Sequence, residues 1–307
     1  MRISGLVPAL VTPVRPDGSI DLETTDRLVD FLIERGAAGV CLGGATSEYP
    51  SFELDERLAV MRSVSRRMPP GRMLVAAIGS SSLQRTVALG RAAFDLGCQA
   101  VLLPMPWFFP YRQPDLAAYA AAVSDAVEGP TLLYDLPGFT SGLDVETAIE
   151  LLESHPRLIG IKDSSGQPDR LARFAAARAG RAWSLLVGDD RHGLAAARQG
   201  WDGAISGLAA CCPELLVALH AAVHDDDTDA AGRLQGLVDE LIERLSVLPT
   251  PWGVRVALSA RGLPTGPLAL PVSAERRAQI RAIEAWLPGW LAAAEIPHLL
   301  AVSDPAA

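Results

Sequence analysis

Long apolar runs are missing from this sequence. No window of about 18 residues stays apolar without a charged or helix-breaking residue, so we expect no membrane-spanning helix. Residues 1–10 also lack the basic segment and long apolar stretch of a secretory signal peptide. We therefore expect a cytoplasmic protein that does not act at a membrane.

Basic residues are too few and too scattered to form a nucleic-acid surface. Lysine and arginine together number 27, against 36 aspartate and glutamate residues, and the net charge is −9. Nucleic-acid-binding domains usually carry a basic stripe, and none is visible here. The expected partners are therefore small molecules rather than nucleic acids.

Cysteine and histidine are not arranged as metal sites. The four cysteines have no metal-ligand spacing, and vicinal Cys211 and Cys212 cannot easily form a disulfide without strain. We expect buried free thiols, in keeping with a reducing compartment. His220 and His224 are four residues apart, a spacing that can bind zinc on a helix, but they lack the glutamate of a metalloprotease motif. Surface or packing roles are expected for both histidines.

Eight short apolar segments alternate along the chain with longer amphipathic ones. We expect strands at 6–11, 39–42, 74–78, 100–103, 131–136, 158–162, 183–188 and 203–206. Helices are expected at 21–35, 55–68, 83–96, 114–127, 145–153, 170–178, 191–199 and 213–224. Alternating units of this kind predict a parallel sheet, and uniformly apolar strands indicate that both of its faces are covered.

Eight units favour closure into an α/β fold of the (β/α)8 TIM barrel type. The alternative is an open doubly wound sheet, which usually has a glycine-rich phosphate loop after its first strand, where this chain has Thr-Pro-Val-Arg at 12–15. We assign residues 1–224 to a catalytic barrel. Residues 225–307, with helices expected at 229–245, 252–260 and 274–294, form a C-terminal helical extension packed on it.

Lys162 ends the sixth expected strand, and barrel active sites lie at the C-terminal ends of strands. Lysine is seldom buried without a reason, and an apolar barrel mouth disfavours its ammonium form. A neutral amine can attack a ketone and form an iminium ion, which withdraws electrons from the adjacent carbon. The alternative is a structural lysine paired with a carboxylate such as Asp163.

Two other strand ends carry suitable polar groups. Tyr134 ends the fifth expected strand, where its hydroxyl can shuttle protons beside a Schiff-base lysine, although a core tyrosine is the alternative. The loop at 43–48 has two glycines that let backbone N–H groups turn toward a small anion, and Thr46 and Ser47 add hydroxyls. This loop suits a substrate carboxylate, or is a simple turn. His192, after the seventh strand, is a further candidate to reach the substrate.

Together these segments resemble the dihydrodipicolinate synthase and N-acetylneuraminate lyase family. The loop at 44–48 is similar to its GTTGE or GSTGE signature, 134–137 to YNxP, and 160–165 to its GIK[ED] lysine motif. Further similar segments lie before and after these motifs, at 5–13, 188–190, 203–207 and 261–266, so the family order holds over nearly the whole chain. An ordered set of motifs is far more specific than any one of them.

The resemblance implies a lyase of the class I aldolase type that acts on pyruvate or a related 2-oxo acid. Lys162 would form the Schiff base and Tyr134 would donate and accept protons. Thr46 and the backbone amide of Ala45 would bind the substrate carboxylate, and the carbonyl of Ile205 would line the site. The family also implies a homotetramer built as a dimer of dimers, with no metal and no organic cofactor.

Three departures from the family pattern concern the second substrate. Ala45 stands where the family commonly has a proton-relaying hydroxyl, and Phe108 stands where the synthases place a tyrosine from the neighbouring subunit. The loop at 137–142 offers Phe139 or Thr140 in place of the arginine that binds a distal carboxylate in the synthases. With Trp107 and Phe109 nearby, these changes predict a less charged aldehyde or a sugar-derived acid.

Three other functions remain open from the sequence. One is 4-hydroxy-tetrahydrodipicolinate synthase of lysine biosynthesis. A second is a catalytically silent barrel that binds a small 2-oxo acid, which the missing hydroxyls at Ala45 and Phe108 suggest. A third is a phosphate-binding barrel, for which the two glycines at 203–207 give the only support.

Overall fold

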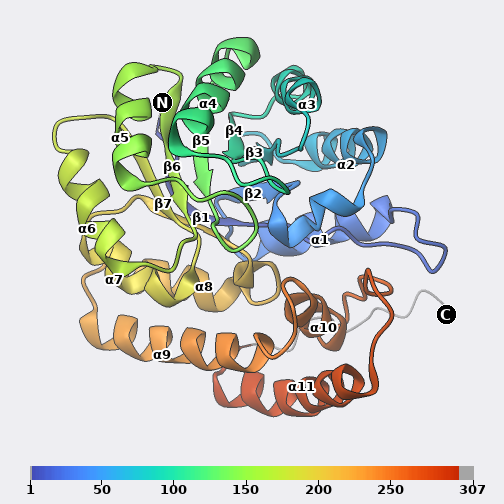
Figure 1. Cartoon of the computed structure of the whole chain (residues 1–307). Helices are drawn as coiled ribbons and strands as arrows, with labels where there is room; N and C mark the ends of the chain where they lie inside the picture. The colour runs from blue at the N-terminus through green and yellow to red at the C-terminus, as the bar shows by residue number, and fades with distance from the viewer. Residues whose placement is uncertain (1, 297–307) are drawn as a thin grey trace.

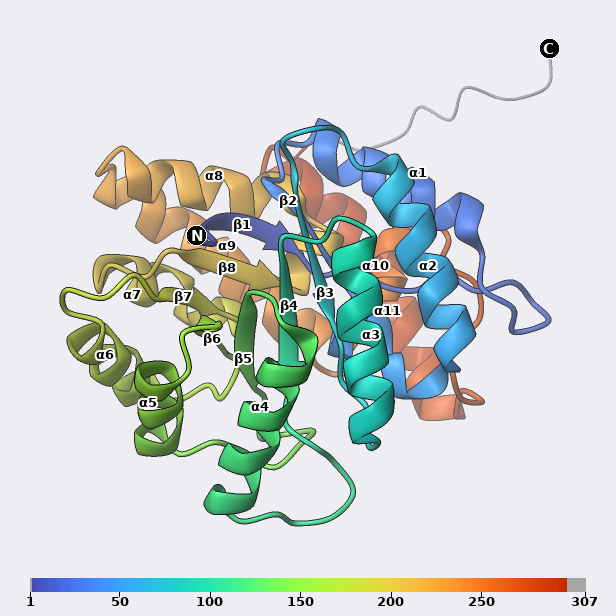
Figure 2. The ribbon, with the colours of Figure 1, turned by 90° about the horizontal axis from the view of Figure 1, so that it is seen from above.

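Eight parallel strands form a barrel in the computed structural model, which describes residues 2–296 (Figures 1 and 2). The strands are β1 (Gly5–Pro8), β2 (Gly39–Leu42), β3 (Met73–Ala77), β4 (Ala100–Pro104), β5 (Thr131–Asp135), β6 (Leu158–Asp163), β7 (Ser184–Val187) and β8 (Gly203–Ser206). Their order is β1-β8-β7-β6-β5-β4-β3-β2. The two ends meet at a parallel bridge between Ala9 and Cys41. The predicted barrel is confirmed and the open sheet is excluded.

A ring of helices covers the outside of the barrel, as Figure 2 shows from above. The ring consists of α1 (Leu22–Glu34), α2 (Leu54–Arg67), α3 (Leu83–Asp95), α4 (Gln113–Val127), α5 (Val145–Ser154), α6 (Pro168–Ala177), α7 (Gly193–Arg198) and α8 (Pro213–His224). Four short 3₁₀ turns lie in the loops: η1 (Ala45–Ser47), η2 (Tyr49–Ser51), η3 (Asp190–His192) and η4 (Leu208–Ala210).

Local sequence explains where the helices begin and end. Asp21 accepts the Thr24 N–H at 3.1 Å and so caps the start of α1, while Gly36 takes a positive φ of 88° just after its end. The Ser82 side chain caps α3 in the same way. These signals are visible in the sequence, which is why most predicted helix bounds lie within one or two residues of the observed ones.

Two predicted elements differ from the structure. The first strand was expected at 6–11, but β1 ends at Pro8, and beyond it only Ala9 bridges to the neighbouring strand β2. The seventh helix was expected at 191–199, but α7 begins only at Gly193. Residues 190–192 instead form η3, because the Asp189 side chain accepts the Arg191 N–H and favours a tight turn over an α-helical one.

The core has two layers. Apolar side chains between the strands and the helices form the larger one, and a smaller one fills the inside of the barrel. Small residues such as Ala9, Cys41 and Ala77 belong to the inner layer together with Tyr134 and Ile205. The barrel is therefore a packed core rather than a pore, and a substrate can reach only its mouth.

Three further helices, α9 (Thr228–Leu245), α10 (Trp252–Ala260) and α11 (Ala274–Ala293), form the C-terminal part below the barrel in Figure 1. Arg255 fastens α10 to the barrel loops, since its Nη1 donates to Glu48 at 2.7 Å. Arg261 pairs with Glu214 of α8 at 3.0 Å. The last eleven residues of the expected extension lie outside the described residues. Within residues 2–296, no helix has the length and apolar character to cross a membrane.

Candidate active site

Lys162 lies near the end of β6, directly beside Tyr134 of β5 in the strand register. Its side chain is buried, with 4% of its surface exposed, and its Nζ lies 4.2 Å from the centroid of the Tyr134 ring. Within residues 2–296 the Nζ has no hydrogen bond and no ion pair. Asp163 instead pairs with Arg170 at 2.7 Å. The alternative of a structural Lys162–Asp163 pair is therefore excluded.

One arginine holds the strand ends that carry Tyr134 and Lys162. Asp135 and Asp163 follow them directly and point away from the barrel interior, where Arg170 of α6 bonds both carboxylates at 2.7 Å. Burial raises the pKa of Asp135 to about 6, against the opposing effects of the Leu143 N–H and Arg170. Because residues alternate faces along a strand, fixing the two outer carboxylates also fixes the two inner side chains.

Glycine at position 188 leaves the space that the lysine occupies. A Cβ atom there would lie 2.6 Å from the Lys162 Cε and 1.9 Å from the Ser164 Oγ. Gly188 follows β7, the other neighbour of β6. Any larger residue would displace the amine from the barrel mouth.

The loop after β2 presents Ala45 and Thr46 to the same region. Gly43 adopts a positive φ of 72°, and residues 45–47 form η1. The Ser47 Oγ accepts the Gly43 N–H at 3.0 Å and donates to the Leu10 carbonyl at 2.6 Å. Ser47 therefore shapes the loop through its hydroxyl, while Thr46 turns toward the cavity.

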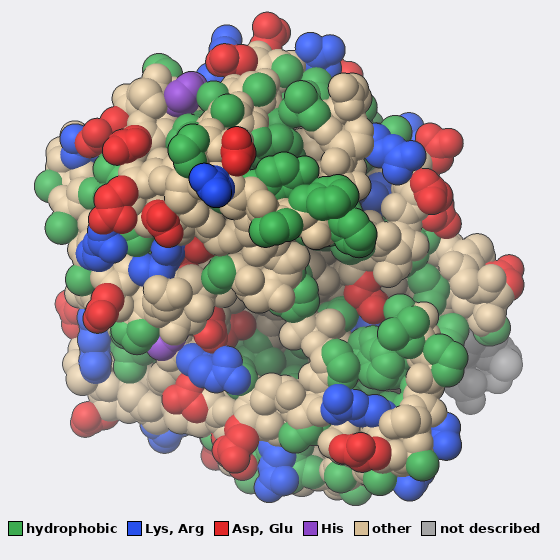
Figure 3. Space-filling view, viewed as in Figure 1, with side chains coloured by type: hydrophobic (Ala, Val, Ile, Leu, Met, Phe, Trp, Pro, Cys, Tyr) green, Lys and Arg blue, Asp and Glu red, His purple; other side chains and the backbone are tan. Residues whose placement is uncertain are grey.

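A cavity of about 340 Å³ opens at the barrel mouth, and Figure 3 shows this face hollowed between the barrel and the C-terminal helices. Of the residues predicted from the sequence, five line it: Lys162, Tyr134, Thr46, Ala45 and Phe139.

Three predicted site residues do not line this cavity. Ser47 is bonded within its loop, and Ile205 is part of the inner barrel core. Phe108 has 85% of its surface exposed and contacts Phe109 edge-on, with a ring separation of 4.9 Å. His192 also lies off the cavity, where its Nε2 is 3.3 Å from the Gly166 carbonyl.

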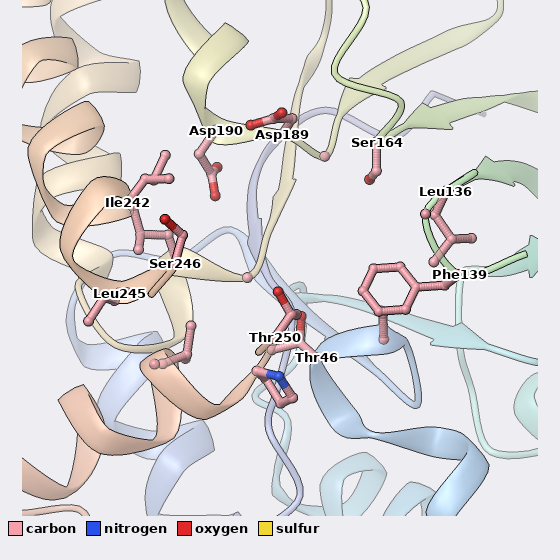
Figure 4. A pocket seen from close by; sticks show the side chains of 18 of the residues that line it. Thr46, Leu136, Phe139, Ser164, Asp189, Asp190, Ile242, Leu245, Ser246 and Thr250 are labelled. Carbon is pink, nitrogen blue, oxygen red and sulfur yellow. The ribbon is translucent and has the colours of Figure 1, made fainter. Parts of the chain in front are cut away.

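The outer part of the cavity comes from segments that the sequence did not single out. The C-terminal helices and the linker between them contribute Ile242, Leu245, Ser246, Leu248, Pro249, Thr250, Pro251, Gly253 and Val254. In Figure 4, Ile242 and Leu245 lie on the opposite side of the cavity from Leu136 and Phe139. No sequence motif marks these residues, because only packing of the extension brings them to the barrel mouth.

The loop after β7 adds three charged residues, Asp189, Asp190 and Arg191. Arg191 is half-exposed and pairs with Asp189 at 3.5 Å. The sequence analysis looked for a carboxylate-binding cation only in the loop at 137–142 and did not consider Arg191. The rule that polar residues at strand ends line the site applies equally to β7 and would have found all three.

One sequence signal for the lysine is stronger than its motif. Lys162 is the only lysine among the 307 residues, where the other 26 of the 27 basic residues are arginine. In a chain that has arginine at every other basic position, a buried lysine points to chemistry that a guanidinium cannot perform.

The remaining metal-site candidates show no cluster. In the described residues, no group of three histidine, cysteine, aspartate or glutamate side chains could hold a metal ion. All four cysteines are free and buried, as predicted. His220 and His224 border a separate groove beside α7 and α8.

The model of the dihydrodipicolinate synthetase family matches residues 2–286, which include every strand and the cavity. The chain belongs to this family. The family members that it resembles include the 4-hydroxy-tetrahydrodipicolinate synthase of Laribacter hongkongensis, 32% identical over 82% of this chain and 88% of that protein. The N-acetylneuraminate lyase of Rhizobium meliloti is 30% identical over 92% of this chain and 94% of that protein.

Solved family structures have the same fold. The chloride-inhibited dihydrodipicolinate synthase from Acinetobacter baumannii, complexed with pyruvate, superposes with a TM-score of 0.86. It is 29% identical to this family member and covers 96% of this chain and 100% of its own. Membership in the dihydrodipicolinate synthetase family makes this chain an enzyme, a lyase of the class I aldolase type.

Proposed function

We propose that this enzyme forms a Schiff base between Lys162 and pyruvate or a related 2-oxo acid. The observation that carries the proposal is a buried amine that has no ion pair among residues 2–296, lies 4.2 Å from the centroid of a tyrosine ring and opens to a cavity. The neutral form of an amine is the nucleophile that attacks a ketone carbon.

The chemistry needs only the side chains of the cavity. The Lys162 nitrogen attacks the C2 carbonyl carbon, and the carbonyl oxygen leaves as water to give an iminium ion. Loss of a proton from C3 gives an enamine, whose C3 attacks an aldehyde carbon; the aldehyde oxygen takes up a proton and the iminium forms again. Water then hydrolyses the iminium and frees the product. The same steps in reverse cleave the bond, so the direction depends on the substrates.

Tyr134 is the proposed proton shuttle, since its ring already contacts the Lys162 Nζ and both line the cavity. Thr46 and the Ala45 amide are the proposed carboxylate site. Because Ala45 has no hydroxyl, a relay through that side chain is impossible, and water at the cavity is the proposed alternative partner of the Tyr134 hydroxyl.

The second substrate is proposed to be a less charged aldehyde or a sugar-derived acid. The outer cavity combines apolar side chains such as Leu245, Leu248 and Phe139 with the hydroxyls of Ser246 and Thr250. Its one arginine already pairs with Asp189. A panel of neutral, hydroxylated and acidic aldehydes, each supplied with pyruvate, tests this part. Turnover of aspartate semialdehyde alone would refute it.

The second candidate is 4-hydroxy-tetrahydrodipicolinate synthase, which the names of several relatives favour. Besides Lys162, Arg191 is the only basic residue among the described residues that line the cavity, so it is the candidate partner for the distal carboxylate of that substrate. Rescue of a lysine-requiring strain by this gene, lost on Arg191→Gln, would support this candidate over the first.

Reduction with borohydride in the presence of pyruvate tests the Schiff base itself. Because the chain has a single lysine, a pyruvate-dependent mass increase must lie on Lys162 or on the terminal amine. Peptide mapping separates the two, and Lys162→Ala is the matched control. An unlabelled wild-type protein would overturn the proposal and leave a silent 2-oxo acid binder.

We also propose a homotetramer. Phe108, Phe109 and Tyr111 are exposed on one loop beside the exposed Phe139, which is unusual for a monomer surface. Light scattering after gel filtration gives the oligomer mass, and a monomer at micromolar concentration would rule this out.

A further inference from the structure

Asp190 is a buried carboxylate at the barrel mouth with no cation within ion-pair distance in the described chain. It has 8% of its surface exposed and lines the cavity together with Lys162. Its Oδ2 accepts the Ser206 hydroxyl at 2.8 Å, and its carboxylate also accepts the Leu208 N–H. Neighbouring Asp189 differs, because it is more exposed and pairs with Arg191.

The same carboxylate holds the turn after β8. Ser206 and Leu208, its two donors, flank Gly207, and the Ser206 Oγ also accepts the Ala209 N–H at 2.9 Å. A Cβ atom on Gly207 would lie 3.0 Å from the Thr46 Oγ1, so this turn packs directly against the proposed carboxylate loop. Asp190 thus connects the β7 end to the residue proposed to bind the substrate carboxylate.

The charge of Asp190 also acts on Lys162. Burial raises the pKa of Asp190 to about 6, whereas its hydrogen bonds and the positive charge of Lys162 lower it. The interaction is mutual, so an ionised Asp190 stabilises positive charge on the lysine nitrogen. The iminium ion is such a charge, in a mouth where burial penalises it.

We propose that Asp190 is a positioning residue that stabilises the iminium ion on Lys162 through its charge and holds Thr46 through the Ser206–Leu208 turn. This inference rests on the proposed Schiff-base function and extends it to a group outside the reacting atoms. Asp190 touches no reacting atom in this role.

The charged and titratable groups around Asp190 are few in the part of the chain described. Lys162 and Tyr134 line the same cavity, Asp189 precedes it in the chain, and Arg191 and His192 follow it on η3. On the α9 side, Gln235 donates to the Asp190 carbonyl at 3.0 Å and to Asp239. On the far side, the groove beside α8 adds three more: Asp202, His220 and His224.

This arrangement predicts an acid limb in a ratio of rates, that of wild type to Asp190→Asn, each measured as the initial rate of borohydride trapping with pyruvate. The ratio cancels pH effects common to both proteins, and it should fall toward one as the pH drops through about 6, because protonated Asp190 is as neutral as asparagine. His220 lies outside the cavity, so His220→Gln should leave the limb in place.

Two variants separate the effect of the Asp190 charge from that of its hydrogen bond with Ser206. Asp190→Asn keeps an oxygen for Ser206 but removes the charge, so trapping at pH 7.5 should slow about tenfold, the effect of one pKa unit. Ser206→Ala keeps the charge but removes a bond that favours ionisation, so its rate relative to Asp190→Asn should fall at a higher pH than that of wild type, and its KM for pyruvate should rise.

Asp226→Asn is the matched control, since Asp226 is exposed and its φ of 55° suits asparagine. A ratio of wild-type to Asp190→Asn trapping rates that does not change with pH would overturn the inference. If Asp190→Asn fails to fold, an unchanged KM for pyruvate in Ser206→Ala would overturn it. Failure of pyruvate to label the wild-type Lys162 at any pH would instead refute the Schiff-base function.

Discussion

The inner and outer ends of the cavity are built in different ways. At the inner end, Lys162 and Tyr134 lie on adjacent strands whose outer faces are fixed by Arg170. At the outer end, the lining comes from loops and from the segment between α9 and α10. Under the proposed function, the inner end would set the reaction, while the outer end could vary its substrate at little cost to the fold.

The strongest test of the inner end is Lys162→Ala. Loss of the only amine in the cavity removes the nucleophile, so activity should fall by at least about 10³-fold. The residual rate of aldehyde consumption with pyruvate, followed by product chromatography, measures this. Circular dichroism must match that of the wild type. Substantial turnover in a folded variant would show that the lysine is not the reacting group.

Arg170→Met tests whether the strand ends depend on one arginine. It leaves Asp135 and Asp163 buried without their shared cation, which should cost about 3–5 kcal/mol of unfolding free energy. Urea denaturation measures the loss. Arg173→Met, which breaks only the exposed pair with Glu146, should cost less than about 1 kcal/mol. Equal losses in the two variants would remove the special role of Arg170.

Phe139→Ala tests the outer end. Phe139 lines the cavity but has 60% of its surface exposed, so the fold should tolerate its loss. We expect a change of about tenfold in the ratio of kcat/KM values between apolar and hydroxylated aldehydes, the scale of one or two lost apolar contacts. Borohydride trapping with pyruvate should not change. A fall in trapping would mean that the two ends are not independent.

The smallest expected effect concerns pH and Asp135. The pKa of Asp135 is about 6 in the folded chain, above the ordinary value of 3.8. Folding therefore favours the protonated carboxyl, whose contribution to the free energy of unfolding is present below about pH 4 and is lost as the pH rises through about 6. Asp135→Asn cannot ionise and should gain stability relative to wild type between pH 4 and pH 7. Melting temperatures of both proteins across this range test the sign, and a constant difference would contradict it.

Particular residues show how far sequence reasoning reached. Lys162, Tyr134, Ala45 and Thr46 line one cavity as expected, because each lies at or just after a strand end, and a parallel barrel brings all such ends to one rim. The same reasoning added the Ser47 hydroxyl to that rim, yet this hydroxyl turns back to the Leu10 carbonyl. Side-chain direction within a short loop is not visible in a motif.

The sequence by itself determined the barrel and the position of Lys162 at its rim, since apolar periodicity specifies strands and helices locally and eight such units close in one way. Tertiary structure alone decided the far wall of the cavity. Residues 242–254 reach the mouth only because Arg255 and Arg261 fasten the C-terminal helices to the barrel. That contact joins segments more than two hundred residues apart, Glu48 and Arg255, and no local pattern encodes such a distance.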